Sequence, residues 1–288
     1  MKQVLIISGK GGTGKTTLTA ALAGLYKDII VADCDVDAPD LHLLLKPKIK
    51  ETTVFQGGKL AVIHKEECTE CGQCREVCQF GAVSIDFNID SMSCEGCRVC
   101  EWNCPSNAIK MIQKESGKSY VSEVICGEMV HALLKPGEEN SGKLVAQVKK
   151  KAKTLAEENN SSLLLIDGPP GIGCPVIASL SGVDLAVVVT EPTKSGIHDM
   201  ERVIKVAEHF NVPVKVVINK FDLNPENSVL ITEYLSEKQI EILGKIPFSK
   251  KFTDALKIGK TIVDYDADCE ESKCVIRIKE QLGDDNDS

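Results

Sequence analysis

Short, almost unbroken runs of apolar residues alternate with stretches of helical periodicity along most of the chain. Runs of this kind are typical of strands that are covered on both faces of a sheet. The predicted strands are Gln3–Ser8, Ile29–Asp33, Leu163–Asp167, Leu185–Thr190, Val214–Ile218 and Ile240–Ile246. The predicted helices are Lys15–Leu25, Lys143–Glu158, Ile197–Phe210 and Ser228–Lys238. The alternation predicts an α/β fold with a doubly wound, mostly parallel sheet.

A cysteine-rich segment interrupts this alternation, which stops near residue 58 and resumes near residue 142. The segment contains an internal repeat, because Cys68–Cys78 and Cys94–Cys104 share one cysteine spacing. Two similar short halves fit a small, pseudo-symmetric α+β domain that depends on bound metal for its stability. The predicted parts of the chain are 1–58 (first part of the main domain), 59–113 (insert) and 114–288 (second part). Within the last part, the connector Ser119–Gly142 follows neither pattern.

Composition and charge limit the classes of function. The chain has 288 residues, 43% of them hydrophobic, which allows a sizeable core. Its net charge of −8 argues against nucleic-acid binding, which requires a basic face. Nine acidic and three basic residues lie in Asp264–Ser288, and we expect this segment to be a solvated, partly frayed terminus.

The chain shows no sign of membrane insertion or export. No apolar run approaches the ~18 residues that span a bilayer. The start Met1–Ile7 is typical of a buried strand rather than a signal peptide. Thirteen cysteines without an export signal indicate reduced thiols and metal sites rather than disulfides. The expected compartment is therefore the cytoplasm, and no membrane partner is expected.

A glycine-rich loop follows the first predicted strand and precedes the first predicted helix. Its pattern Gly-x4-Gly-Lys-Thr is that of a P-loop, whose backbone N–H groups close around phosphates. Lys15 would neutralise charge on the β- and γ-phosphates, and Thr16 would offer its hydroxyl to Mg²⁺. The predicted nucleotide-binding residues of this segment are Gly9, Lys10, Gly11, Gly12, Thr13, Gly14, Lys15, Thr16 and Thr17.

The early lysine, Lys10, makes this loop resemble the deviant Walker A motif of the MinD/ParA/Mrp and nitrogenase iron-protein superfamily of P-loop ATPases. In that superfamily the early lysine reaches the nucleotide of the neighbouring subunit. The resemblance therefore implies an ATP-sandwich homodimer in which Lys10 acts in trans. The alternative for Lys10 is a solvated side chain on a mobile loop.

Carboxylates follow two of the predicted strands. At the carboxyl edge of a parallel sheet they can hold hydrated Mg²⁺ or orient an attacking water. The superfamily's switch I pattern maps most simply onto Asp35, supported by Asp33, while Asp37 and Asp40 leave the assignment open. Asp167-Gly168-Pro169-Pro170-Gly171 resembles the Walker B and switch II segment, with Asp167 bound to Mg²⁺ through water and glycines that allow movement. The resemblance thus implies the catalytic residues Lys10, Lys15, Asp35 and Asp167, with Thr16 and Asp35 at Mg²⁺.

A base-binding segment is indicated by Asn219-Lys220-Phe221-Asp222, which has the NKxD form that many GTPases use to read guanine. In the superfamily the equivalent asparagine meets adenine, and Ile246-Pro247-Phe248 resembles the segment beside the base. The predicted base-binding residues are Asn219, Asp222 and Pro247. The deviant loop favours ATP, and GTP stays open as an alternative.

The cysteine quartets indicate either zinc or iron–sulfur clusters, since thiolates are soft ligands. Structural zinc sites usually pair two short cysteine knuckles across a longer gap. Here each quartet places three cysteines at Cys-x2-Cys-x2-Cys, and the fourth, three residues on, serves the other cluster. We predict two [4Fe–4S] clusters held by Cys68, Cys71, Cys74 with Cys104, and by Cys94, Cys97, Cys100 with Cys78. The segment resembles bacterial two-cluster ferredoxins, although Gln79 stands where proline is usual.

Five cysteines lie outside the quartets. Cys34 is expected to be a small buried residue at a strand end. Cys126, Cys269 and Cys274 are expected to be free thiols without a site. Cys174 stands where the nitrogenase iron protein has a cluster ligand, and it could face its copy across a dimer; a buried structural cysteine is the alternative.

Three functions fit these motifs. The first is an ATP-gated redox protein in which ATP hydrolysis controls electron transfer through the two clusters to a partner protein. The second is an iron–sulfur or metallocofactor assembly factor, similar to the Mrp scaffold proteins. The third, a positioning or partition ATPase, is disfavoured because the chain has neither a membrane helix nor a basic patch.

Overall fold

The computed structural model describes residues 1–138 and 141–283, and the chain divides into two compact units. The larger unit comprises Met1–Thr52, Ser119–Leu133 and the described chain from Ser141 onward. The smaller unit comprises Thr53–Lys118 and residues 134–138. It contains the whole segment 59–113 expected as an insert, and it extends beyond both of those boundaries because two long strands run through them.

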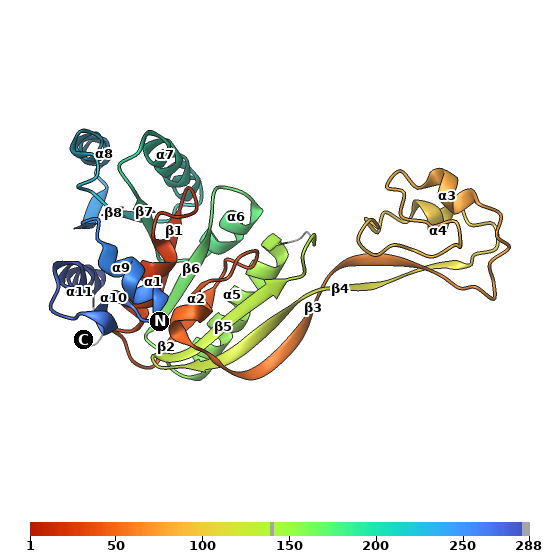
Figure 1. Ribbon diagram of the computed structural model, residues 1–288, viewed down its shortest axis with the longest axis horizontal. Helices are drawn as coiled ribbons and strands as arrows, with labels where there is room; N and C mark the ends of the chain where they lie inside the picture. Colours follow the sequence, from red (N-terminus) through yellow and green to blue (C-terminus); the bar gives the residue numbers. More distant parts are fainter. Residues whose placement is uncertain (139–140, 284–288) are drawn as a thin grey trace. The chain divides into compact units, whose positions relative to one another are not determined.

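Nine strands form one sheet among the described residues, in the order β3-β4-β5-β2-β6-β1-β7-β8-β9 (Figure 1). The strands are β1 (Lys2–Ser8), β2 (Ile29–Asp33), β3 (Lys48–Ile63), β4 (Ile109–Val124), β5 (Gly127–Leu134), β6 (Leu163–Pro170), β7 (Leu185–Thr190), β8 (Val214–Asn219) and β9 (Glu241–Ile246). From β5 to β9 every neighbouring pair is parallel. The predicted α/β class with a mostly parallel sheet is therefore confirmed.

Helices connect the strands of the larger unit and cover its sheet, whereas the smaller unit has only two short ones. The helices are α1 (Lys15–Ala23), α2 (Leu41–Leu45), α3 (Gln73–Val77), α4 (Val99–Trp102), α5 (Ser141–Glu158), α6 (Cys174–Leu180), α7 (Lys194–His209), α8 (Pro225–Glu237), α9 (Lys250–Lys257), α10 (Ile262–Tyr265) and α11 (Glu270–Leu282). None of the described helices combines the length and apolar character needed to cross a membrane.

The core of the larger unit follows from the two-residue period of its strands. Val4 and Ile6 of β1 pack in one cluster with residues of α1 and α11. The alternate residues Leu5 and Ile7 face the other side of the sheet and are also fully buried. Since both sets are apolar and buried, helices must cover both faces, which is why these strands are unbroken apolar runs.

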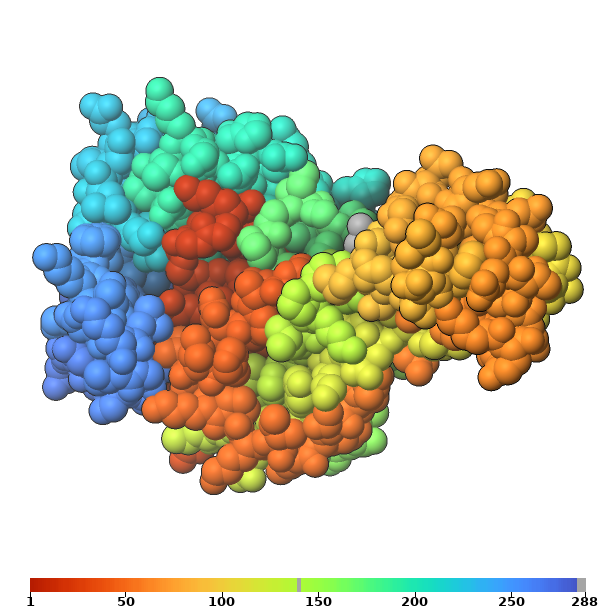
Figure 2. Space-filling model, turned by 45° about the vertical axis from the view of Figure 1, so that its right-hand side comes forward, coloured from red at the N-terminus to blue at the C-terminus, as the bar shows by residue number. Residues whose placement is uncertain are grey.

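The acidic C-terminal segment is folded, so the expectation of a frayed terminus was wrong for its described part. Val275, Ile278 and Leu282 lie on one stripe of α11 and are buried against the core. Glu270 and Glu280 are exposed and lie off that stripe, whereas Glu271 lies on it and is buried. Glu270 and Glu271 occupy the first turn, where the helix dipole favours negative charge. Figure 2 shows this blue segment beside the red and orange N-terminal part of the larger unit, in keeping with the contact between α11 and α1. Residues 284–288 of the predicted tail lie outside the described residues.

The ambiguous connector Ser119–Gly142 contains the end of β4 and all of β5. β5 pairs in parallel with β2, the strand that ends at Asp33. Gly127 begins β5 at a φ of 140°, and a Cβ there would lie 2.1 Å from the carbonyl oxygen of Ile29. The strand therefore needs glycine at the point where it meets β2.

The smaller unit has little apolar core. Its core cluster consists of the buried residues Ala61, Cys74, Val83 and Ile109, and partly buried cysteines pack against them. A core this small gives limited stability by hydrophobic burial alone, so the unit needs additional cross-links.

Candidate functional site

The loop between β1 and α1 has the backbone shape of a phosphate loop. Gly12 and Gly14 adopt φ values of 80° and 92°, which residues with a Cβ rarely reach. A Cβ on Gly9 would lie 2.5 Å from backbone atoms of Asp199. These glycines are therefore required by the fold of the loop, and they let its backbone approach a ligand closely.

Asp167, in the second half of β6, accepts hydrogen bonds from three side chains of α1. Its Oδ1 accepts from Lys15 Nζ at 3.0 Å and from Thr19 Oγ1 at 2.9 Å. Its Oδ2 accepts from Thr16 Oγ1 at 2.8 Å, and Lys15 also donates to that hydroxyl at 3.1 Å. The fold thus brings together the predicted Lys15, Thr16 and Asp167. Thr19 was not predicted, although its place one turn after Lys15 on the same helix face points to it.

Asp33 and Asp35 lie beside this group. Asp33 is paired in register with Asp167 on the neighbouring strand, and Asp35 Oδ2 lies 4.0 Å from Lys15 Nζ. Burial, and then the negative charge of Asp167, raise the pKa of Asp33 well above its usual value. Burial also raises the pKa of Asp35, against the opposing effect of Lys15. Asp37 and Asp40, the other two candidates, are exposed.

Two buried polar atoms of this site have no hydrogen-bond partner in the described structure: Asp33 Oδ2 and Thr13 Oγ1. Buried polar atoms without partners are rare because each costs free energy. A nucleotide with hydrated Mg²⁺ would supply polar partners at this place. The donors and acceptors here therefore fit Mg²⁺ and phosphate.

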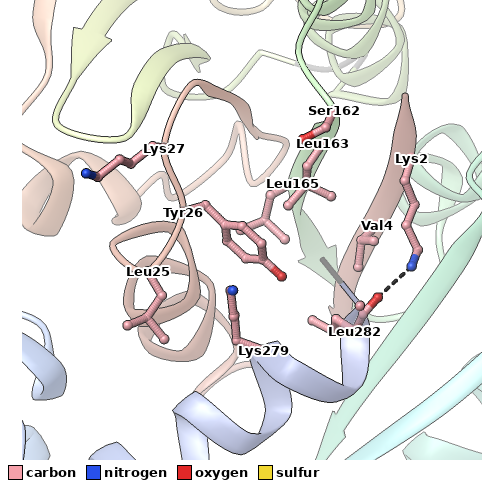
Figure 3. A pocket seen from close by; sticks show the side chains of 11 residues that line it. Lys2, Val4, Leu25, Tyr26, Lys27, Ser162, Leu163, Leu165, Lys279 and Leu282 are labelled. Atoms are coloured by element: carbon pink, nitrogen blue, oxygen red, sulfur yellow. Dashed lines mark hydrogen bonds between the residues drawn. The ribbon is translucent and has the colours of Figure 1, made fainter. Parts of the chain in front are cut away.

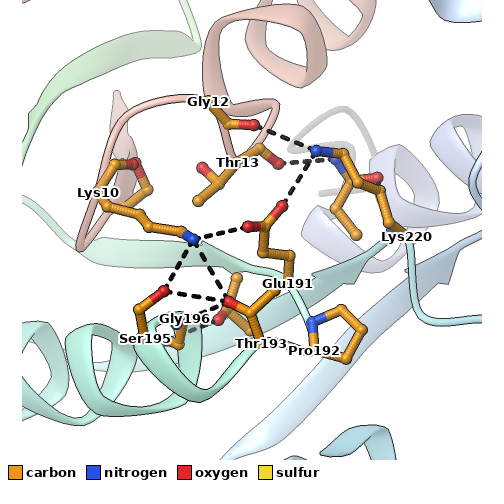
Figure 4. A network of polar contacts seen from close by, with 12 residues as sticks. Lys10, Gly12, Thr13, Glu191, Pro192, Thr193, Ser195, Gly196 and Lys220 are labelled. Carbon is orange, nitrogen blue, oxygen red and sulfur yellow. Dashed lines mark hydrogen bonds and ion pairs between the residues drawn. The ribbon is translucent and has the colours of Figure 1, made fainter. Parts of the chain in front are cut away.

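Lys10 is held within its own chain (Figure 4). Its Nζ lies 2.7 Å from Glu191 Oε1 and donates to Thr193 Oγ1 at 3.3 Å and Ser195 Oγ at 3.1 Å. The other carboxylate oxygen of Glu191 pairs with Lys220 Nζ at 3.0 Å. Burial raises the pKa of Glu191, but its hydrogen bonds to the two lysines outweigh burial, so the net shift is downward. Glu191 was not predicted, and its only sequence signal is its place directly after an apolar strand.

A cavity of about 300 Å³ adjoins the phosphate loop, and both Asn219 and Pro247 line it. Asn219 Nδ2 donates to the carbonyl oxygen of Thr13 at 2.7 Å, which fixes the loop against β8. Asp222 Oδ1 accepts from the backbone N–H of Phe248 at 2.7 Å, so it shapes the cavity from outside the lining. The remaining lining residues are mostly apolar: Gly12, Gly14, Thr17, Leu18, Val189, Lys220, Ile246, Phe248, Ser249, Phe252, Thr253, Leu256 and Val275.

The eight quartet cysteines line two hollows in the smaller unit, four around each. The first hollow is lined by Cys68, Cys71, Cys74 and Cys104, and the second by Cys78, Cys94, Cys97 and Cys100. These are the two predicted ligand sets. Among the described residues, no three His, Cys, Asp or Glu side chains converge as they would around one metal ion.

The pKa values of the quartet cysteines shift in different directions. Burial, and then the neighbouring Cys68 and Cys71, raise the pKa of Cys74. Burial also raises the pKa of Cys104, but hydrogen bonds from Ser106 and the following backbone outweigh it and lower the pKa. The hydroxyl of Ser106 lies 3.7 Å from Cys104 Sγ.

The five cysteines outside the quartets differ in solvent exposure. Cys34 is fully buried, as predicted, and burial raises its pKa. Cys126, Cys269 and Cys274 are free and buried. Cys174 is exposed at the start of α6, and a Cβ on Gly142 would lie 3.1 Å from its Cβ.

A second cavity, of about 290 Å³, lies at the amino ends of β1 and β6 (Figure 3). Lys2 Nζ donates to the carbonyl oxygen of Leu282 at 2.5 Å, and Lys279 Nζ lies 5.2 Å from the centre of the Tyr26 ring. The length of β1 separates this cavity from the phosphate loop. This second cavity therefore lies beside the end of α11 and is not part of the nucleotide site.

Known proteins resemble the chain over nearly its whole length. The family model of the CobQ/CobB/MinD/ParA nucleotide binding domain matches residues 4–262. An uncharacterized protein of Methanocaldococcus jannaschii, MJ0578, is 37% identical over 97% of this chain and 96% of its own length. An iron-sulfur cluster carrier protein of the same organism is 23% identical over 97% of this chain and 84% of its own length. The structure of the Pyrococcus furiosus cell division ATPase MinD shares the fold, with a TM-score of 0.59 and 18% identity over 98% of both chains.

Proposed function

The chain belongs to the CobQ/CobB/MinD/ParA family of nucleotide-binding domains, and on that premise we propose that it is a Mg²⁺-dependent ATPase that carries two [4Fe–4S] clusters. ATP binding and hydrolysis would drive a cycle of homodimer formation and release, and this cycle would control electron transfer through the clusters to a redox partner protein. One observation carries the proposal. The Lys15–Thr16–Asp167 group and two hollows of four cysteines each occur in a single chain.

The residues of the nucleotide site have distinct roles in this proposal. Lys15 stabilises negative charge on the transferred phosphoryl group, and Thr16 and Asp167 hold Mg²⁺, directly and through water respectively. Asp35 Oδ2 lies 4.0 Å from Lys15 Nζ. In this proposal Asp35 orients the attacking water and lies close to Mg²⁺. Lys10 would leave its own chain and stabilise the nucleotide of the other subunit.

ATP fits the base cavity better than GTP. Guanine reading by an NKxD segment requires a free aspartate carboxylate that accepts from the base. Here Asp222 Oδ1 accepts from the backbone of Phe248 and lies outside the lining of the cavity. Asn219 and Pro247 remain as the predicted base contacts.

The two hollows fit four-iron clusters better than zinc. A zinc ion requires four sulfur atoms about 2.3 Å from a single point. The cysteines instead surround a space, with three from one quartet and the fourth from the other, as in two-cluster ferredoxins. Bound clusters would supply one-electron redox chemistry, and the chain's own contribution is to hold and shield them.

Carriage of iron–sulfur clusters is the second candidate function. It is favoured by the relatives that are named iron-sulfur cluster carrier proteins, which speak for carriage more directly than for electron transfer. The four cysteines around each hollow favour the first candidate, because a complete ligand set holds a cluster firmly. No partner protein is identified, and the expected cytoplasmic location and absence of nucleic-acid and membrane partners stay predictions.

Two measurements on the anaerobically purified full chain separate these functions. The first is the midpoint potential of the clusters with and without Mg–ATP, with Lys15→Ala as the matched control. The second is cluster transfer to an apo-ferredoxin in the presence of a chelator. A nucleotide-dependent potential in the native chain alone supports gated electron transfer. Transfer of intact clusters under ATP supports carriage and would exclude the redox function.

A further inference from the structure

Glu191 joins two lysines from different parts of the nucleotide site (Figure 4). Its two carboxylate oxygens pair with Lys10 at 2.7 Å and with Lys220 at 3.0 Å. Lys220 also donates to the carbonyl oxygen of Gly12 at 3.3 Å. One carboxylate therefore connects the start of the phosphate loop, the end of β7 and the segment after β8.

All three N–H donors of the Lys10 ammonium group have partners within its own chain. A lysine has three N–H donors, and Lys10 has three partners: Glu191, Thr193 and Ser195. The hydroxyl of Thr193 also accepts from the N–H of Gly196, which fixes it at the start of α7. The Lys10 side chain is 30% exposed and that of Glu191 is 14% exposed, so solvent and salt screen this pair less than an open surface pair.

We propose that Glu191 is a positioning residue that holds Lys10 on its own chain and sets the cost of transferring this lysine to the nucleotide of a second chain. The inference rests on the proposed ATP-dependent homodimer. While Lys10 keeps its three partners, it has no free N–H donor for a phosphate in another subunit. When Lys10 leaves, Glu191 keeps Lys220 as its counter-ion, so no carboxylate is left buried without a partner.

Replacement of Glu191 by glutamine tests this role, because it keeps the shape and removes the charge. The dissociation constant of the dimer is measured by analytical ultracentrifugation of the full, cluster-loaded chain with Mg²⁺ and a non-hydrolysable ATP analogue. We expect Glu191→Gln to tighten the dimer by roughly two- to five-fold, the range of a partly exposed ion pair. The tightening should disappear in a Lys10→Ala background, since no lysine is then left to release.

The matched control is Glu241→Gln, which removes the carboxylate of another ion pair, Lys215–Glu241, from the same unit. It should leave the dimer unchanged. A dimer of equal or lower affinity in Glu191→Gln, or the same tightening without Lys10, would overturn the inference while leaving the ATP-dependent dimer intact. A native chain that stays monomeric with the analogue would overturn both proposals.

A second variant guards against a folding defect. Glu191→Asp keeps the charge but is too short to hold both lysines, so it should tighten the dimer by a smaller factor than glutamine. Circular dichroism reports whether each variant is folded. If neither variant folds, Glu191 is needed for the structure itself and the positioning role is excluded.

Discussion

At the residue scale, the site depends on a carboxylate that accepts hydrogen bonds from one lysine and two threonine hydroxyls. Asp167 is buried, and its two oxygens accept from three side chains of α1. Charge-assisted hydrogen bonds of this kind are short and strong, and their geometry depends on both oxygens being acceptors. The same carboxylate raises the pKa of its neighbour Asp33. Its negative charge therefore organises the site from its centre.

Asp167→Asn should lower ATP hydrolysis by about 100-fold or more. The amide places an N–H₂ group where Lys15, Thr16 or Thr19 now donates, so at least one donor loses its acceptor. Phosphate release at saturating ATP measures the effect. Asp184→Asn is the matched control, because Asp184 accepts from the backbone of Gln3 at the opposite edge of the sheet. A variant within threefold of the native rate would show that Asp167 does not act at Mg²⁺.

Chemistry decides which site residues the sequence can identify. Lys15, Thr16 and Asp167 were predicted because phosphate and Mg²⁺ demand these residue types at fixed spacing, and the structure brings them into contact. Glu191 and Lys10 are far apart in the sequence and form an ion pair only in the folded chain. No local sequence motif therefore identifies Glu191.

His131 predicts a pH dependence of stability. It is 9% exposed, and its Nε2 lies 2.9 Å from Ser122 Oγ. Burial, and then nearby His42, lower the pKa of His131 to about 4. The folded chain therefore binds a proton less tightly than the unfolded chain, whose histidine pKa is about 6.5. Stability should be lost as the pH falls from about 6.5 towards 4.

The expected loss between pH 7.5 and pH 5.5 is about 1 kcal/mol from this residue. Urea unfolding at several pH values measures it. In His131→Gln the stability should depend less on pH over this range. His198→Gln, which alters an exposed histidine, should keep the native dependence. An unchanged slope in His131→Gln would contradict the assignment.

At the scale of elements, six strands were predictable from apolar runs in the sequence, and β3, β4 and β5 were not. β1, β2, β7, β8 and β9 were predicted to within one residue at each end, and β6 begins as predicted but continues three residues beyond Asp167. β3 and β4 carry many exposed polar residues, and β5 contains a buried histidine, so none of them forms such a run. The buried apolar stripe of α11 was not predicted, because the many acidic residues of the segment indicated a solvated terminus rather than an amphipathic helix.

The contact between β9 and α11 can be tested with glycine. A Cβ on Gly244 would lie 2.7 Å from Ile278 Cγ1, closer than side chains pack. Gly244→Ala should therefore cost about 1 to 3 kcal/mol, and Ile278→Ala about 2 to 5 kcal/mol. In the double variant the new methyl group occupies space left by the isoleucine, so its cost should be at least ~1 kcal/mol below the sum.

Chemical denaturation of the four chains gives these free energies of unfolding. Gly24→Ala is the control, since a Cβ there meets its neighbours at 3.7 Å and the backbone φ is −63°. That variant should unfold close to the native midpoint. Strict additivity of Gly244→Ala and Ile278→Ala would show that α11 does not pack as described.

At the scale of the whole molecule, two units with different sources of stability share one chain. The larger unit has an extended apolar core, whereas the core of the smaller unit includes cysteines that line two hollows. Under the proposed cluster assignment, loss of one cysteine should lower the metal content and leave the nucleotide site intact.

Cys100→Ser should lower the iron content from about eight to about four atoms per chain, because it removes one ligand from a single hollow. Iron and sulfide analysis with electron paramagnetic resonance measures this loss. ATP affinity should stay within twofold. Cys126→Ala, which changes a buried cysteine outside the hollows, should retain all of the iron. An unchanged iron content in Cys100→Ser would contradict the cluster assignment.

The strand order has a consequence for how the chain folds as it leaves the ribosome. β6 lies between β1 and β2, so these first two strands do not pair with each other and are joined in the sheet only once β6 has been made. β2 ends at Asp33 and β6 begins at Leu163, with most of the smaller unit encoded between them. At ordinary rates of translation the gap lasts on the order of ten seconds. During this interval β1 and β2 lack the strand that joins them, while the cysteine-lined unit emerges and has time to fold first.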